Sequence, residues 1–205
     1  MSSLVALAHD AALTIAVLSA SVLGGLLVYN LARPSFGLWP APESSGWRHR
    51  LSFGLFRVFC GATVVFALLD FAPLEVGGWV RWLIGAPIML GAFGAMLWGY
   101  RFLGIDNTYC EADGLVTTGL YACSRNPQYV FSVAATVGLG LTAASATTIV
   151  LAGVLFALYF LFALNEERWL ADGYGAAFRS YKKETPRFID ERSIRRARSA
   201  LAARR

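Results

Sequence analysis

Long apolar runs separated by short polar stretches occupy most of the chain. Three early runs are each long enough to cross roughly 30 Å of hydrocarbon as a helix. A fourth run, residues 127–164, is apolar apart from a small polar break at residues 142–148, which is typical of a tight helical hairpin. The pattern therefore predicts five membrane-spanning helices, at residues 4–31, 51–71, 79–103 and in the two arms of 127–164.

The connections between these runs differ in their content of Lys and Arg. The proline-rich first connection carries Arg33, Arg48 and Arg50, the second carries no Lys or Arg, and most of the remainder lie after residue 164. Basic residues in short loops favour the cytoplasmic side. We therefore expect the N-terminus outside, with the first connection, the polar stretch 104–126 and the C-terminal tail in the cytoplasm.

Composition agrees with an all-α integral membrane protein. Hydrophobic residues make up 57% of the chain and charged residues only 15%, and the mean hydropathy is +0.54. A soluble domain of this length needs more polar surface. The net charge of +5 comes largely from the Arg-rich tail. Since that tail follows a membrane span and has few aromatic residues, attraction to anionic lipid headgroups is a simpler explanation than nucleic-acid binding.

Cysteine and histidine content argues against two classes of site. The three cysteines, Cys60, Cys110 and Cys123, are odd in number and form no C-x-x-C pair, so neither a disulfide framework nor a zinc site is predicted. The two histidines, His9 and His49, are far apart in the sequence. We predict no metal site.

The first candidate site is the start of the hairpin at Arg125-Asn126-Pro127. Asn is favoured at a helix N-cap and Pro at the first helical position, so a helix is predicted to begin here. Its free N–H groups and the Arg125 cation would favour an anionic group. The simpler interpretation is a capped helix with an interfacial arginine.

The second candidate site is Asn165-Glu166-Glu167-Arg168, expected to close the fifth span at the same membrane face. Two carboxylates at a helix C-terminus oppose the helix dipole and need compensation. Arg168 could provide it, and so could a ligand with a positive centre. Beyond this point, aromatic residues spaced by three or four predict an amphipathic helix on the membrane within residues 174–189.

The ordered motifs carry a family resemblance. In chain order they are Leu115-Val116-Thr117-Thr118-Gly119-Leu120-Tyr121, Arg125-Asn126-Pro127-Gln128-Tyr129, Glu166-Glu167-Arg168, and Gly175, Tyr181 and Pro186. With the apolar hairpin between them, they resemble the isoprenylcysteine carboxyl methyltransferases and the related phospholipid methyltransferases. The resemblance covers about residues 114–189, and the first three spans carry no matching motif.

This resemblance implies an integral membrane enzyme that uses S-adenosylmethionine to methylate a lipophilic small molecule or lipid. By position, it implies catalytic roles for Arg125 and Glu166. It implies that the cofactor is held by Tyr121, Asn126, Pro127, Tyr129, Glu166, Glu167, Tyr181 and Arg187. Asn126 stands where the family usually has His, and Asn cannot transfer a proton near pH 7. That departure favours a carboxylate or thiol acceptor over an amine.

Three units are expected: transmembrane helices in 1–103, a catalytic and cofactor-binding region in 104–190, and a basic cytoplasmic tail in 191–205. Other functions stay open at this point. One is N-methylation of a phospholipid amine, and another is an NADPH-dependent enzyme similar to the sterol reductases, which usually have more spans. The last is a non-catalytic lipid-binding membrane protein. The sequence does not indicate the oligomeric state.

Overall fold

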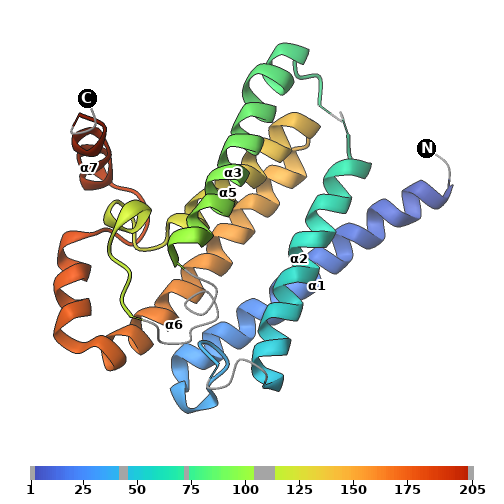
Figure 1. Ribbon diagram of the computed structural model, residues 1–205. Helices are drawn as coiled ribbons and strands as arrows, with labels where there is room; N and C mark the ends of the chain where they lie inside the picture. The colour runs from blue at the N-terminus through green and yellow to red at the C-terminus, as the bar shows by residue number, and fades with distance from the viewer. Residues whose placement is uncertain (1–2, 42–45, 72–73, 104–113, 203–205) are drawn as a thin grey trace.

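The computed structural model describes residues 3–41, 46–71, 74–103 and 114–202, and all regular structure in these ranges is helical (Figure 1). The first part of the predicted 104–126 connection, including Cys110, and the last three residues of the basic tail lie outside these ranges. In chain order, the elements are α1 (Ser3–Ala32), η1 (Pro34–Phe36), α2 (Trp47–Leu69), η2 (Val80–Gly85), α3 (Ala86–Leu103), η3 (Gly119–Ala122), α5 (Pro127–Ala143), α6 (Ala146–Glu184) and α7 (Glu191–Ala202). The all-α prediction is confirmed.

Four helical stretches in the described chain are long and apolar enough to cross a membrane: α1, α2, residues 80–99 of η2 and α3, and α6. Helix α5 has 17 residues, which gives it a length of roughly 25 Å and puts it at the lower limit for a spanning helix. It forms the predicted hairpin with the first half of α6. The turn lies at Ala144, which has a left-handed φ of 53°, and the Ser145 hydroxyl accepts a hydrogen bond from the Thr148 N–H at 3.1 Å.

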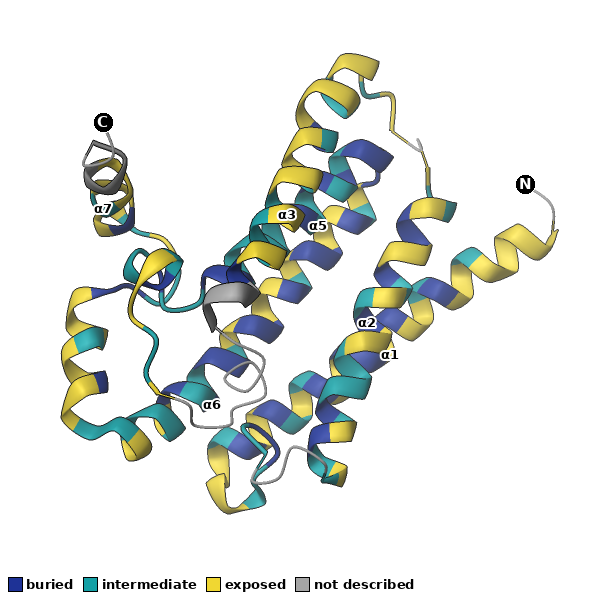
Figure 2. Ribbon diagram, viewed as in Figure 1, coloured by how far each residue is buried: buried dark blue, intermediate teal, exposed yellow. Residues whose placement is uncertain are grey.

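The helices pack through apolar side chains and a few glycines. Leu23 and Leu27 of α1 meet Phe59 of α2 and Leu158 of α6 in one buried cluster. Helix α5 lies very close to α3, because a Cβ on Gly138 would collide with the backbone of Met89. Figure 2 shows the outer faces of α1 and α3 as largely exposed, the expected pattern for helices that face lipid.

Helix α6 extends well past the point where the sequence predicted its end. It continues through Asn165 and Glu167 to Glu184, with one bend at Gly175, where φ is 52° and ψ is −118°. Residues 165–174 contain good helix formers and no proline, so nothing ends the helix where the membrane-spanning part stops. The prediction that Glu166 and Glu167 close a helix was therefore wrong.

The chain after Gly175 also differs from the expected single amphipathic helix at residues 174–189. The last part of α6 ends at Glu184, an irregular segment follows, and the separate amphipathic helix α7 starts at Glu191. The irregular segment returns toward the bundle, since the Phe188 ring lies 5.2 Å from Phe156 and 6.3 Å from Phe160, between centroids. Residues far beyond the last span are thus brought back beside it.

Candidate active site

A pocket lies at the end of the bundle where the connection after α1, the segment after residue 114 and the middle of α6 meet. Its walls include Trp39 from that connection, Phe53 and Phe56 from α2, and Met96 from α3. The described parts of these connections therefore meet at one end of the bundle. Most of the predicted site residues line the pocket as well, namely Tyr121, Arg125, Asn126, Tyr129, Glu166, Glu167 and Tyr181. Pro127 and Arg187 do not.

Glu167 is surrounded by three cations. Its Oε1 lies 3.0 Å from Nη2 of Arg125 and 2.6 Å from Nε of Arg187, while Oε2 lies 2.7 Å from Nζ of Lys182. Arg187 also donates from Nη2 to Oε2 at 3.1 Å, which makes this pair bidentate. This charge-assisted bond raises the pKa of the Arg187 guanidinium. Glu167 therefore fastens two arginines and a lysine from separate segments.

Arg125 retains unused hydrogen-bonding capacity. Its side chain is only 9% exposed, and its Nε and Nη1 have no hydrogen-bond partner among the described residues. Burial lowers the pKa of this guanidinium, an effect that Glu167 opposes, and an arginine stays protonated throughout the physiological range. Buried donors without partners cost free energy unless a ligand or water satisfies them. Arg125 thus offers two donors to an anion in the pocket.

Glu166, one residue earlier, has a different environment. Its Oε1 accepts hydrogen bonds from the Trp39 indole N–H at 2.8 Å and from the Tyr129 hydroxyl at 2.5 Å. The Tyr129 ring stacks on Tyr159 with centroids 4.1 Å apart and an interplanar angle of 17°. All described bonds of Glu166 come from neutral donors. Its carboxyl group therefore lines an aromatic pocket with no described cation bound to it.

Asn126 occupies the N-cap position of α5, and Pro127 is its first residue, as predicted. The prediction that the Asn126 side chain caps the helix was wrong, however, because it makes no capping hydrogen bond to α5. Its Nδ2 instead donates to the backbone oxygen of Arg187 at 3.0 Å. The Arg125 N–H likewise donates to the backbone oxygen of Pro186 at 2.9 Å. The segment before α5 is thus held against the segment after α6.

Tyr121 and Tyr181 join the same two segments. The Tyr181 hydroxyl donates to the backbone oxygen of Tyr121 at 2.6 Å, and Tyr121 is buried. Both rings line the pocket. They hold the η3 turn against the last part of α6, close to Arg125.

Arg168 does not provide the compensation proposed from the sequence. Its Nη1 donates to the backbone oxygen of Leu31 at 3.2 Å, and no ion pair joins it to Glu166 or Glu167 in the described structure. A helix that continues past these residues turns Arg168 away from its neighbours, because successive side chains point about 100° apart. The expected need for compensation rested on a helix end that the structure does not have. The cations that Glu167 binds are instead Arg125, Lys182 and Arg187.

Sequence reasoning missed a polar network that positions Trp39. Asn30 of α1 donates from Nδ2 to the backbone oxygen of Trp39 at 2.9 Å and to Oδ1 of Asn165 at 2.7 Å. The Oδ1 of Asn30 accepts a hydrogen bond from the Leu38 N–H at 2.8 Å. Both asparagines are buried. An asparagine near the end of an apolar span was the available signal, since polar side chains there usually join helices.

Gln128 was also missed, although it lies inside the recognised motif. Its side chain is buried and lines the pocket, and its Nε2 has no hydrogen-bond partner among the described residues. Together with Arg125 it offers unpaired donors beside the Glu166 carboxyl. The arrangement suits a ligand that carries both an anionic group and a cationic or hydroxyl-bearing group.

Sequence comparisons show which known proteins this chain is similar to. The model of the phospholipid methyltransferase family matches residues 80–177. The match begins in the third span, where the sequence analysis had found no motif. The cobalt-zinc-cadmium resistance protein CzcN of Cupriavidus metallidurans is 33% identical over 165 residues, which cover 80% of this chain and 74% of that protein.

A second relative is the nickel-cobalt-cadmium resistance protein NccN of Alcaligenes xylosoxydans xylosoxydans, 26% identical over 163 residues, with 78% of this chain and 74% of that protein covered. No solved structure matches the chain. The family match includes the described Arg125, Glu166 and Glu167, and the relatives extend the similarity across most of the chain. The chain belongs to the phospholipid methyltransferase family of membrane methyltransferases.

Proposed function

We propose that this protein transfers a methyl group from S-adenosylmethionine to a lipophilic acceptor and that the pocket at Arg125 and Glu166 holds the cofactor. One observation carries the proposal. Two donors of an arginine whose side chain is only 9% exposed have no partner among the described residues, and they line the same aromatic pocket as a carboxyl group held by neutral donors. S-adenosylmethionine carries a carboxylate, an ammonium group, ribose hydroxyls and a sulfonium, which match these groups.

The side chains that would hold the cofactor follow from their chemistry. Arg125 and Gln128 have N–H donors for its carboxylate that no described residue accepts from. Glu166 has a carboxyl group for its ammonium or ribose hydroxyls. The rings of Trp39, Tyr129 and their neighbours form walls of the pocket. Aromatic rings attract a cation, so these walls suit the sulfonium group. Glu167 is occupied by three cations, so we assign it to holding Arg125 in place.

When bound, S-adenosylmethionine supplies an electrophilic methyl group on a sulfonium. The remaining tasks of the protein are to align the acceptor with that group and to exclude water. The bidentate Arg187–Glu167 pair fixes the Arg125 guanidinium, and the aromatic rings give the pocket an apolar lining that disfavours water. No residue is required to form a covalent bond with either reactant.

The proposed acceptor is lipophilic because apolar side chains of α2 and α3, including Phe53, Phe56 and Met96, form one side of the pocket. Both helices have exposed apolar faces, so the bilayer can supply such a molecule. We favour a carboxylate, or a thiol that reacts as its thiolate, because these anions need no residue to remove a proton. Asn126 cannot accept a proton, and its amide already binds the Arg187 backbone.

A phospholipid amine is the second candidate acceptor. The matching family is named for phospholipid methylation, and Glu166 lies beside the pocket, where it could accept a proton from an amine. We also propose that the pocket faces the cytoplasm, since Lys and Arg are concentrated in the connections and tail at this end.

Methyl transfer in nanodiscs tests the proposal. The purified protein would be given S-adenosylmethionine with a radiolabelled methyl group and separate panels of lipophilic acids, thiols and amines. We expect label in an acid or thiol, whereas label only in amines would replace the favoured acceptor with the second candidate.

A binding comparison addresses the other functions. S-adenosylmethionine should raise the unfolding temperature of the protein and NADPH should not. Stabilisation by NADPH alone would support a reductase, and no stabilisation by either cofactor, together with no methyl transfer, would support a non-catalytic lipid-binding protein.

A further inference from the structure

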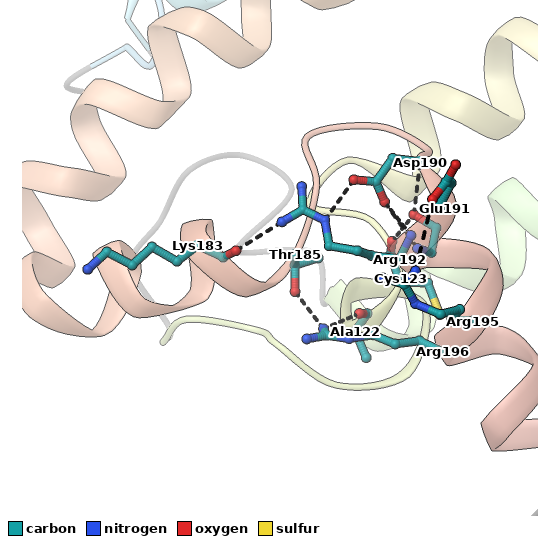
Figure 3. A network of polar contacts seen from close by, with 10 residues as sticks. Ala122, Cys123, Lys183, Thr185, Asp190, Glu191, Arg192, Arg195 and Arg196 are labelled. Carbon is teal, nitrogen blue, oxygen red and sulfur yellow. Dashed lines mark hydrogen bonds and ion pairs between the residues drawn. The ribbon is translucent and has the colours of Figure 1, made fainter.

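Helix α7 fastens the segment that leads to Arg125 (Figure 3). The Ser193 hydroxyl donates to the backbone oxygen of Cys123 at 2.6 Å, and Nη1 of Arg196 donates to the backbone oxygen of Ala122 at 2.7 Å. The same Nη1 lies 2.9 Å from the Thr185 hydroxyl oxygen. Ser193 is buried at this contact. One face of α7 therefore joins the η3 turn to the end of α6.

The opposite face of α7 is exposed and amphipathic. Ile194 is 49% exposed, the Arg195 side chain is 69% exposed, and Arg198 is exposed. At 100° per residue these three positions point away from Ser193 and Arg196. Glu191 shares this face, 4.0 Å from Arg195, so the arginines leave it with net positive charge. Apolar and basic side chains together suit an anionic membrane surface.

The connection before α7 follows exposed apolar side chains of α6, which is an argument for a nearby bilayer that does not depend on charge. Phe188 contacts Phe156 and Phe160 on the membrane-spanning part of α6, and both of those side chains are among the exposed apolar residues. The Arg187 guanidinium lies 5.1 Å from the Phe160 ring centroid. Ile189, which follows, is 61% exposed. The chain thus approaches α7 along the lipid-facing side of α6.

We propose that the outward face of α7, formed by Ile194, Arg195 and Arg198, binds anionic lipid headgroups and thereby stabilises residues 119–125 at the rim of the pocket. The proposal rests on the proposed function only where it concerns the cofactor. Cofactor binding by the enzyme would then depend on membrane composition. Anionic lipid would fix α7 at the membrane surface, and α7 would in turn fix the segment that leads to Arg125. S-adenosylmethionine should then bind more tightly in an anionic bilayer.

Two readouts test this in nanodiscs of phosphatidylcholine alone or mixed with phosphatidylglycerol. Hydrogen exchange at the backbone amides of residues 119–125 should slow in the anionic discs, and this readout involves no cofactor. The Kd for S-adenosylmethionine should fall by about tenfold, which is within the attraction expected for two arginines near an anionic surface. High salt should remove both effects. Equal exchange in the two lipids would overturn the inference, whereas absence of cofactor binding in both would contradict only the proposed function.

Matched variants separate this contact from a general effect of charge. Arg195→Gln/Arg198→Gln should abolish the lipid dependence. The control Arg179→Gln/Lys183→Gln removes the same charge from exposed positions on α6, and the Lys183 side chain points away from α7 (Figure 3), so it should keep the dependence. Ser193→Ala should speed exchange at residues 119–125 in both lipids. An equal loss of lipid dependence in the control pair would contradict a specific role for α7.

Discussion

Glu166 and Glu167 are adjacent on α6, yet their surroundings differ in kind. Glu167 binds three cations through both oxygens. Glu166 accepts from an indole and a phenol through one oxygen and lies among aromatic rings. Both carboxyl groups line the same pocket. The Glu167 carboxylate is neutralised by cations of the protein itself. The Glu166 carboxyl group has no described cation partner, so it can bind a cation of a ligand.

This difference indicates that the two neighbouring carboxyl groups have different roles, one in stability and one in ligand binding. A buried carboxylate that neutralises several cations maintains structure, since removing it leaves their charge uncompensated. A carboxyl group held by neutral donors is oriented but can still take part in binding. Substitutions at the two positions should therefore differ in the property they change, and the following predictions test that contrast.

The largest effect is expected from Glu167→Ala. Arg125, Arg187 and Lys182 would lose their common partner, and the loss for such a buried group is about 3 kcal/mol. The unfolding temperature in detergent should fall by roughly 6–12 °C. Asp172→Asn, which neutralises an exposed carboxylate on the same helix, is the control and should change it little. A Glu167→Ala protein as stable as the wild type would refute the structural role.

Glu166→Gln should have the opposite profile. Gln keeps an oxygen to accept from Trp39 and Tyr129 but loses the charge proposed to bind the cofactor. The affinity for S-adenosylmethionine should fall by about tenfold to a hundredfold, with little change in unfolding temperature. Calorimetric titration measures the first quantity. A variant that unfolds early and binds the cofactor normally would reverse the proposed roles.

A smaller loss is expected from Tyr129→Phe, which removes one donor to Glu166 and keeps the ring stacked on Tyr159. Loss of one such bond should weaken cofactor binding by about threefold to tenfold. Tyr159→Phe is the matched control, because its hydroxyl donates to Ser132 at 2.9 Å rather than to Glu166. If both variants weaken binding equally, the Tyr129 hydroxyl has no special role.

The smallest effect is expected from Arg168→Gln. This arginine follows the two glutamates directly, but it donates to the backbone of Leu31 at an exposed site. Its loss should change stability by at most about 0.5 kcal/mol and leave cofactor affinity unaltered. Denaturation and titration of the same sample measure both. A loss as large as that of Glu167→Ala would mean that Arg168 belongs to the cation cluster after all.

The positions of the helices could be predicted because hydropathy records them directly. The expected spans at 4–31 and 51–71 correspond closely to α1 and α2, and the hairpin break falls at the observed turn. The end of α6 could not be predicted this way. The change from apolar to polar side chains after residue 164 marks only the exit from the membrane. The helix continues beyond that point, because its backbone hydrogen bonds do not depend on the hydropathy of the side chains.

Residues of the candidate site could be predicted from the sequence only where they lie in short contiguous motifs. Arg125, Tyr129 and Glu166 were found because short patterns around them resemble a family. Trp39 was missed because its bond to Glu166 joins residues 127 positions apart. The role of Asn126 was missed for the same reason, since its partner oxygen lies 61 positions away and only the folded chain brings the two together.

The central claim is that Arg125 presents to S-adenosylmethionine the two donors, Nε and Nη1, that have no partner in the described part of the chain. The direct test is the Kd for S-adenosylmethionine of the wild type and of Arg125→Gln in nanodiscs, each sample first shown to unfold at a similar temperature. The claim predicts that the wild type binds and that the variant binds about tenfold to a hundredfold more weakly. Equal affinities of the two proteins would contradict it.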